Sequence, residues 1–89
     1  MWDVRLTPLA KRQLKRLDED IRLEAVNLLL DLEDGIFPSD KVRLRKYERY
    51  ERVKFAGNRF RIIYRINRKL KTILVTRIRP RDAETYSGF

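Results

Sequence analysis

Apolar and polar residues alternate at the start of the chain, and helical spacing then replaces that alternation. Trp2, Val4 and Leu6 alternate with polar neighbours, which predicts a short strand with one buried face. Thr7-Pro8 indicates the start of a helix, because Thr can accept a hydrogen bond from a free N–H group and Pro is tolerated in the first turn. The inner positions of this first amphipathic helix are Leu9, Ala10, Gln13, Leu14 and Leu17.

A second helix is predicted directly after the first. Asp18-Glu19-Asp20 places carboxylates at its N-terminus, where the helix dipole favours negative charge. Gly35 and Pro38 end it. Because the connection is very short, the two helices are expected to form an antiparallel hairpin. The inner stripe of the second helix comprises Ile21, Ala25, Leu28, Leu29 and Leu32, widened by Val26 and Leu30.

From Val42 onward the apolar period changes to two. An extended segment begins at Val42 and includes Leu44 and Lys46. Ala56-Gly57-Asn58 predicts a turn, since Gly and Asn accept positive φ at low cost, and Asn67-Arg68-Lys69 predicts another. These turns separate three strands of an expected antiparallel meander, at about 50–55, 60–66 and 72–79.

The alternation within these strands predicts two different faces of a sheet. One face is apolar and can be covered by the helix hairpin; it would hold Val53, Phe55, Phe60, Ile62, Tyr64, Ile66, Leu74 and Ile78. The other face would hold Arg52, Lys54, Arg59, Arg61, Arg77 and Arg79, with Ile63, Ile73 and Val75 at one end. The expected fold class is α+β, with an N-terminal strand, an antiparallel helix hairpin and a C-terminal antiparallel β-meander packed on the helices, all in a single domain of residues 1–89.

The net charge of +9 is divided unequally along the chain. Residues 1–40 carry six Lys or Arg and nine Asp or Glu, whereas residues 41–89 carry sixteen and four. Cations concentrated on one sheet face attract a polyanion and release its counterions on binding, which favours a nucleic-acid partner. The alternative interpretation is that Arg and Lys only solvate the open face of an antiparallel sheet.

Composition excludes several classes of site. Without cysteine there are no disulfides and no thiolate metal ligands, and without histidine the usual imidazole base and the commonest metal ligand are missing. With four carboxylates in the basic half, neither a metal site nor a paired-carboxylate enzyme is expected, and no cofactor is implied. No apolar run approaches the roughly 20 residues of a membrane span, and an apolar leader is missing from the start, so a cytoplasmic protein with no membrane partner is expected.

The C-terminal segment adds a second kind of side chain to the cations. Pro80 ends the last predicted strand, Arg79 and Arg81 flank it, and Tyr86 follows a few residues later. An aromatic ring near arginines is suited to stacking on an unpaired base. Tyr86 could equally attach the tail to the core, and both interpretations remain open at this stage.

Together these segments resemble the RelE/ParE superfamily of bacterial and archaeal toxins, and RelE most closely. The resemblance runs from the first strand to Tyr86 and is most specific from Phe60 to Tyr64. It is carried by two helices followed by a meander, and by Tyr50-Glu51-Arg52-Val53-Lys54-Phe55, Gly57-Asn58-Arg59-Phe60-Arg61-Ile62-Ile63-Tyr64, Arg79-Pro80-Arg81 and Tyr86.

The resemblance implies a metal-independent endoribonuclease that cuts messenger RNA in the ribosomal A site, by attack of a ribose 2′-hydroxyl on the adjacent phosphate. By motif position, Lys54 would be the general base and Arg61 would stabilise the transition state. Arg52 would hold the phosphate, Arg81 would stabilise the leaving oxygen electrostatically, and Tyr86 would stack on a base. Further RNA-binding cations would be Lys46, Arg59, Arg77 and Arg79.

The same resemblance implies the partners. A type II toxin is expected to bind the ribosome and messenger RNA, and to be neutralised by an antitoxin with an acidic, amphipathic tail. The toxin would be monomeric alone and heteromeric with its antitoxin. Two alternatives remain: a ParE-like inhibitor of DNA gyrase, and an RNA-binding module without catalytic activity.

Overall fold

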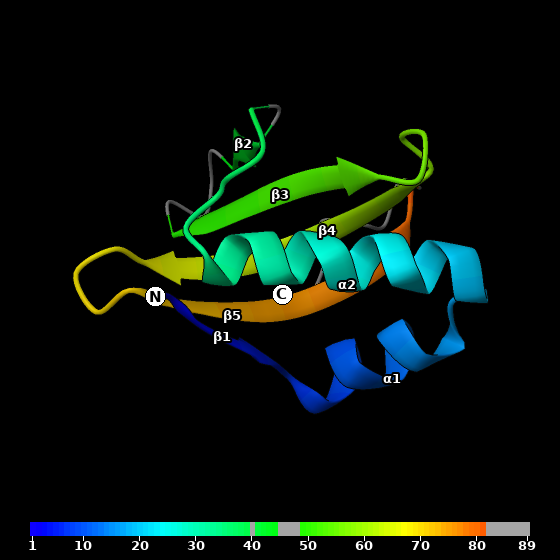
Figure 1. Ribbon diagram of the computed structural model, residues 1–89, viewed down its shortest axis with the longest axis horizontal. Coiled ribbons are helices and arrows are strands. Elements are labelled where there is room, and N and C mark those ends of the chain that lie inside the picture. Colours follow the sequence, from blue (N-terminus) through cyan, green and yellow to red (C-terminus); the bar gives the residue numbers. More distant parts are fainter. Residues whose placement is uncertain (40, 45–48, 82–89) are drawn as a thin grey trace.

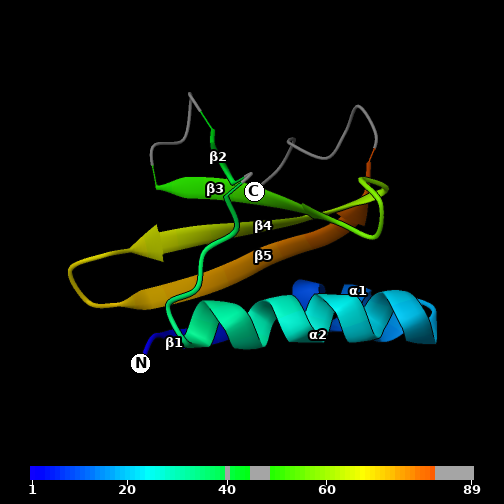
Figure 2. The ribbon, with the colours of Figure 1, turned by 45° about the horizontal axis from the view of Figure 1, so that its top comes forward.

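A computed structural model describes residues 1–39, 41–44 and 49–81. In this part of the chain, strands form one mixed sheet, and two helices lie against one of its faces (Figures 1 and 2). In chain order the elements are β1 (Asp3–Leu6), α1 (Pro8–Arg16), α2 (Glu19–Glu33), β2 (Val42–Arg43), β3 (Tyr50–Phe55), β4 (Phe60–Asn67) and β5 (Thr72–Pro80). The predicted α+β class, the N-terminal strand and both helices are confirmed.

The strand order in the sheet is β1-β5-β4-β3-β2. The pairs β3–β4 and β4–β5 are antiparallel, as the predicted meander requires, whereas β1 runs parallel to β5. The first strand of the chain therefore pairs with the last strand, and β5 lies inside the sheet. The extended segment predicted from Val42 forms a strand only at Val42–Arg43, where it pairs with β3. Lys46 lies outside the described residues.

Two hydrogen bonds fix the first helix, one at its N-terminus and one between its inner face and the sheet. Thr7 caps it, because its Oγ1 accepts a hydrogen bond from the Ala10 N–H at 3.1 Å. The side chain of Gln13 accepts a hydrogen bond from the Ile78 N–H of β5 at 2.7 Å. Gln13 is thus a polar residue on the inner face that ties α1 to the sheet.

The core lies between the helices and the sheet. Ala25, Leu29 and Leu32 of α2 are buried there, with Ile21 and Leu28 packed against them. The predicted widening of this stripe is wrong at Leu30, which is 51% exposed. Residues next to each other on a helix differ in direction by about 100°, so Leu30 points away from the sheet when Leu29 faces it.

One correction to the predicted sheet faces concerns β5. Ile63 pairs with Arg77 and Tyr64 pairs with Val75, so Thr76 is an extra residue between two consecutive pairs. Such a β-bulge reverses the alternation beyond it. Ile73 and Val75 therefore belong to the core, and the prediction that Leu74 shares a face with Ile78 is wrong. The remaining members of the predicted core face in β3 and β4 are confirmed.

Candidate nucleic-acid interface

Cationic side chains form two rows across the sheet face opposite the helices. Strand register places Lys54 of β3 beside Arg61 of β4, and Arg61 beside Arg79 of β5. The neighbouring row, two residues along each strand, is Arg52, Ile63 and Arg77. We refer to these as the cation rows. Rows two residues apart on strands are separated by about 7 Å. The bulge at Thr76 brings Arg77 and Arg79 onto this face while Ile73 and Val75 remain in the core.

Arg52 has a buried donor that lacks a partner. Its Nη1 is buried and makes no hydrogen bond within the described part of the protein. An unpaired buried donor costs about 1–3 kcal/mol, and more when the group is charged. A negatively charged ligand bound at the cation rows would remove this cost.

Arg61 is nearly buried, with 5% of its surface exposed. Its Nη1 donates to the carbonyl oxygens of Asn58 at 2.9 Å and Phe60 at 3.1 Å. Ala56, Gly57 and Asn58 in this turn have φ values of 53°, 64° and 69°. The predicted turn is confirmed, and Arg61 ties its Asn58 carbonyl to the start of β4. A guanidinium has five N–H donors, so Nε and Nη2 carry further donors that these two hydrogen bonds do not use.

Arg59 and Arg81 meet where the meander ends. Arg59 lies in the turn before β4, and its Nε donates to the Ala56 carbonyl at 3.0 Å. The Arg81 N–H donates to the Arg59 carbonyl at 2.7 Å, so the chain beyond β5 stays beside β4. This hydrogen bond places the backbone of Arg81 at the same end of the sheet as the first cation row.

The remaining predicted residues are not brought into one cavity. Tyr86, like Lys46, lies outside the described residues. Lys54 lines a hollow of ≈ 660 Å³ between the 56–58 turn and α2, which contributes Glu24 and Asp31. Arg79 lines a separate hollow of ≈ 290 Å³ beside the helix hairpin. In the described part of the chain, the cations are grouped by strand register and not by a shared enclosed pocket.

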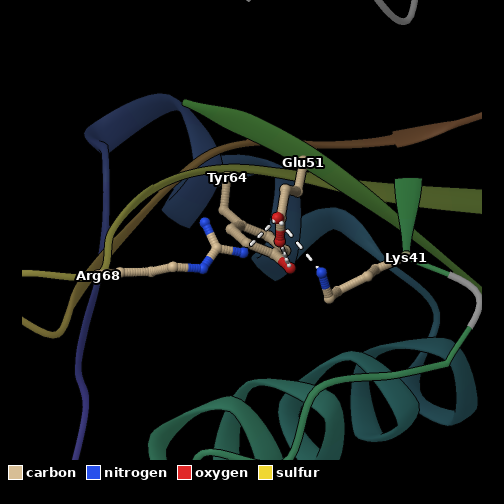
Figure 3. Close-up of polar contacts among 4 residues, drawn as sticks. All are labelled: Lys41, Glu51, Tyr64 and Arg68. Carbon is tan, nitrogen blue, oxygen red and sulfur yellow. Dashed lines mark hydrogen bonds and ion pairs between the residues drawn. The ribbon is translucent and has the colours of Figure 1, made fainter. Parts of the chain in front are cut away.

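A buried carboxylate lies behind the cation rows, and sequence reasoning did not identify it. Glu51 is 1% exposed and points to the helix side of β3. Figure 3 shows it between Arg68 and Lys41, with Tyr64 alongside. Its oxygens accept hydrogen bonds from Arg68 at 2.7 Å, Tyr64 Oη at 2.8 Å and Lys41 at 3.4 Å. The signal in the sequence was a Glu at a core position of the alternation, opposite Tyr64 in the next strand.

Glu51 connects three segments by these contacts. Lys41 precedes β2, and Arg68 lies in the turn between β4 and β5, so one carboxylate joins the edge of the sheet to that turn. Burial raises the pKa of Tyr64 above its ordinary range, and the hydrogen bond to Glu51 raises it further. Tyr64 is therefore a neutral donor at physiological pH. Arg52, which follows Glu51 in β3, lies on the opposite face of the sheet.

The charge of Glu51 should make stability depend on pH. Burial acts to raise the pKa of its carboxyl, but hydrogen bonds from Arg68 and Tyr64 and the charge of Lys41 lower it below its ordinary value of 4.5. A carboxyl whose pKa is lower in the folded state contributes stability that is complete above the unfolded-state pKa and is lost as pH falls through the folded-state value. We expect the urea midpoint to decrease below about pH 4.5 more steeply in the parent than in Glu51→Gln. Equal slopes in urea titrations from pH 7 to pH 3 would contradict this.

Comparison with known proteins now places these features in a family. The ParE toxin family of type II toxin–antitoxin systems matches residues 4–84. The chain belongs to this family. It is therefore a toxin of a type II toxin–antitoxin system, and the resemblance to the RelE/ParE superfamily is confirmed. No curated protein matches the chain in sequence.

Solved structures similar to this toxin are RelE proteins. A mutant of the Escherichia coli toxin RelE in the free state has a TM-score of 0.79 at 15% identity, over 97% of this chain and 90% of that one. The RelBE2 toxin–antitoxin complex of Mycobacterium tuberculosis gives 0.74 at 24% identity, over 90% and 98%. The archaeal RelE–RelB complex of Pyrococcus horikoshii gives 0.74 at 19%, over 92% and 97%. At these identities the likeness is one of fold, and the RelE-like architecture of the toxin is confirmed.

Two further observations concern the described residues of the toxin alone. Within residues 1–39, 41–44 and 49–81, no three Asp or Glu side chains lie close enough together to hold a metal ion. None of the helices in that part is long and apolar enough to cross a membrane.

Proposed function

We propose that this toxin is an endoribonuclease that cuts messenger RNA in the ribosomal A site without a metal ion. The observation that carries the proposal is the row formed by Lys54, Arg61 and Arg79 on a sheet face opposite the helices. Fixed cations of this kind stabilise the negative charge that develops on a phosphate during transesterification. The unpaired Nη1 of Arg52 in the next row supports an anionic ligand at the same place.

The proposed reaction uses only the protein's side chains and the RNA. Lys54 removes the proton of a ribose 2′-hydroxyl, and the 2′ oxygen forms a bond to the adjacent phosphorus. The bond from phosphorus to the 5′ oxygen breaks, which leaves a 2′,3′-cyclic phosphate and a 5′-hydroxyl. Arg61 and Arg52 stabilise the phosphate, and Arg81 stabilises the departing oxygen, which takes its proton from water. Arg81 acts by charge, because arginine stays protonated in proteins.

The remaining predicted residues complete the interface with RNA. Arg59, Arg77 and Arg79 contact phosphates around the scissile linkage, and Lys46 extends that contact. Tyr86 stacks on an unpaired base and so positions the nucleotide at the cut.

A cognate antitoxin is the proposed regulatory partner. The similar solved structures from Mycobacterium tuberculosis and Pyrococcus horikoshii are complexes of a toxin with its antitoxin. For this chain we propose an antitoxin with an acidic, amphipathic tail that neutralises the cation rows and releases the toxin when it is degraded. The toxin is then monomeric alone, heteromeric in the complex, and active in the cytoplasm where ribosomes are.

Incubation with programmed ribosomes tests the proposal directly. The purified toxin is added to ribosomes that hold a defined messenger, and 5′ ends are mapped by primer extension. New 5′ ends are expected within the codon in the A site, and they should carry a 5′-hydroxyl and not a 5′-phosphate. Intact messenger with stably bound toxin would instead identify a non-catalytic RNA-binding module.

Inhibition of DNA gyrase is the second candidate, because the family that matches residues 4–84 is named for ParE. The ParE branch acts on gyrase without a site that activates a phosphate. Supercoiling by purified gyrase separates the two functions. An endoribonuclease leaves supercoiling unchanged, whereas loss of supercoiling together with intact messenger would favour the gyrase inhibitor.

A further inference from the structure

A third row of residues continues the cation rows toward the other end of the same sheet face. Register aligns Tyr50, Arg65, Leu74 and Arg5 across β3, β4, β5 and β1. This row lies two residues beyond Arg52 on β3 and two beyond Ile63 on β4, or about 7 Å further along the strands. Positive charge on this face therefore extends well past the proposed cleavage site.

A cavity of ≈ 310 Å³ opens at this third row. Arg5, Arg49 and Arg65 line it, together with the apolar side chains of Leu70 and Leu74. We call it the arginine pocket. Its arginines come from β1, from the residue before β3, and from β4. The antiparallel pairing of β3 with β4 brings Arg49 near Arg65, and the parallel pairing of β1 with β5 adds Arg5.

The charge of the arginine pocket is largely uncompensated. Asp3 is the carboxylate in its lining, and it already pairs with Arg5 at 3.1 Å. The side chains of Arg49 and Arg65 are exposed, and neither makes a hydrogen bond or an ion pair within the described part of the chain. Guanidinium groups bind phosphate oxygens in a bidentate fashion, which makes two free arginines around one cavity suited to a phosphodiester.

We propose that the arginine pocket binds backbone phosphates of the same RNA strand that is cut at the cation rows. This inference rests on the proposed function, since it assumes that the rows hold single-stranded RNA. The three rows share one face and follow one another at equal steps along β3 and β4, so an extended strand lying over the first two reaches the third. Leu70 and Leu74 offer an apolar surface to the sugar or base beside the bound phosphate. The pocket thus lengthens the stretch of messenger held during cleavage.

Binding of non-cleavable RNA tests the pocket separately from catalysis. The probes are two 2′-O-methyl oligoribonucleotides, one spanning two rows and one spanning all three, and affinity is measured by fluorescence anisotropy at several salt concentrations. For R49A/R65A we expect roughly tenfold weaker binding of the longer probe, and a salt slope smaller by about 1.4, from two lost phosphate contacts on a single strand. The shorter probe should bind both proteins equally.

Two control variants complete the experiment. K11A/R12A removes the same charge from the exposed surface of α1, on the other side of the sheet, and should leave the binding of both probes unchanged. R49K/R65K keeps the charge but loses the bidentate geometry, so it should restore the salt slope and only part of the affinity for the longer probe. Circular dichroism checks that each variant is folded.

Other results would overturn the inference. These are unchanged binding of the longer probe by R49A/R65A, equal losses with both probes, or a loss of the same size in K11A/R12A. An acidic peptide serves as a third probe, and a loss of its binding in R49A/R65A with unchanged binding of both oligonucleotides would assign the pocket to a protein partner. Failure of the proposed cleavage is recognised separately, as intact messenger on programmed ribosomes, because the binding measurement does not require the bond to break.

Discussion

Lys54→Ala is expected to lower messenger cleavage on programmed ribosomes by about 10²–10⁴-fold, the usual contribution of a general base. The side chain of Lys54 makes no hydrogen bond or ion pair within the described residues, so its removal should leave thermal stability nearly unchanged. The measurement is the single-turnover cleavage rate with saturating toxin, alongside a thermal denaturation curve.

Lys54→Arg separates proton transfer from charge. Arginine preserves the positive charge in the row with Arg61 but cannot act as a base. If Lys54 accepts the 2′-hydroxyl proton, Lys54→Arg should be nearly as slow as Lys54→Ala. Cleavage by Lys54→Arg at the parent rate would show that only the charge matters.

Arg61→Ala is expected to reduce cleavage by about 10²–10³-fold, because it removes a fixed charge placed for the transition state. It also removes two hydrogen bonds to the Asn58 and Phe60 carbonyl groups, so we expect a stability loss of about 1–3 kcal/mol. Cleavage must therefore be measured at a temperature at which the variant is fully folded.

Arg59→Ala is the matched control for this dual role. Arg59 also donates to a carbonyl of the same turn, that of Ala56, but lies outside the first cation row. Arg59 is exposed and its side chain makes one hydrogen bond, so its removal should cost less stability than Arg61→Ala and only a several-fold loss of cleavage. If Arg59→Ala and Arg61→Ala lost activity equally, Arg61 would act by holding the turn and not by stabilising the transition state.

The helices and the meander could be predicted from local patterns. Burial of one face requires apolar residues at helical spacing in residues 8–33 and at alternate positions in residues 50–66, and both patterns are visible in the sequence. The turn at Gly57 and Asn58 was likewise predictable, because those residue types tolerate positive φ. The parallel pairing of β1 with β5 leaves no local trace, since it depends on contacts between the two ends of the described chain.

The candidate site was predictable only in part. The cations of β3 and β4 follow simple alternation, so Lys54 and Arg61 could be placed on one face from the sequence. In β5, regular alternation with no bulge at Thr76 places Arg77 and Arg79 on the correct face but assigns Ile73 and Val75 to the wrong one. A bulge depends on the pairing of two strands, and Thr76 itself gives no signal of it.

The roles of two charged residues, Arg5 and Glu51, could not be predicted, because their neighbours in space are distant in the sequence. Arg5 lies in residues 1–40, which have a net negative charge, so the charge pattern along the sequence does not group it with the cations of residues 41–89. Glu51 is one of the four carboxylates of residues 41–89, and its position between Tyr50 and Arg52 in the alternation implies burial. Both residues gain their roles from neighbours in space.

The inner position of β5 has a consequence for synthesis of the toxin. β1 has no partner until residues 72–80 have been made, and β4 is paired on one side only until then. A nascent chain that still holds this segment inside the ribosomal exit tunnel cannot complete the sheet or align Arg79 with Arg61. The first cation row can therefore be completed only after residues 72–80 have left the tunnel, whereas both helices and the β3–β4 pair can form earlier.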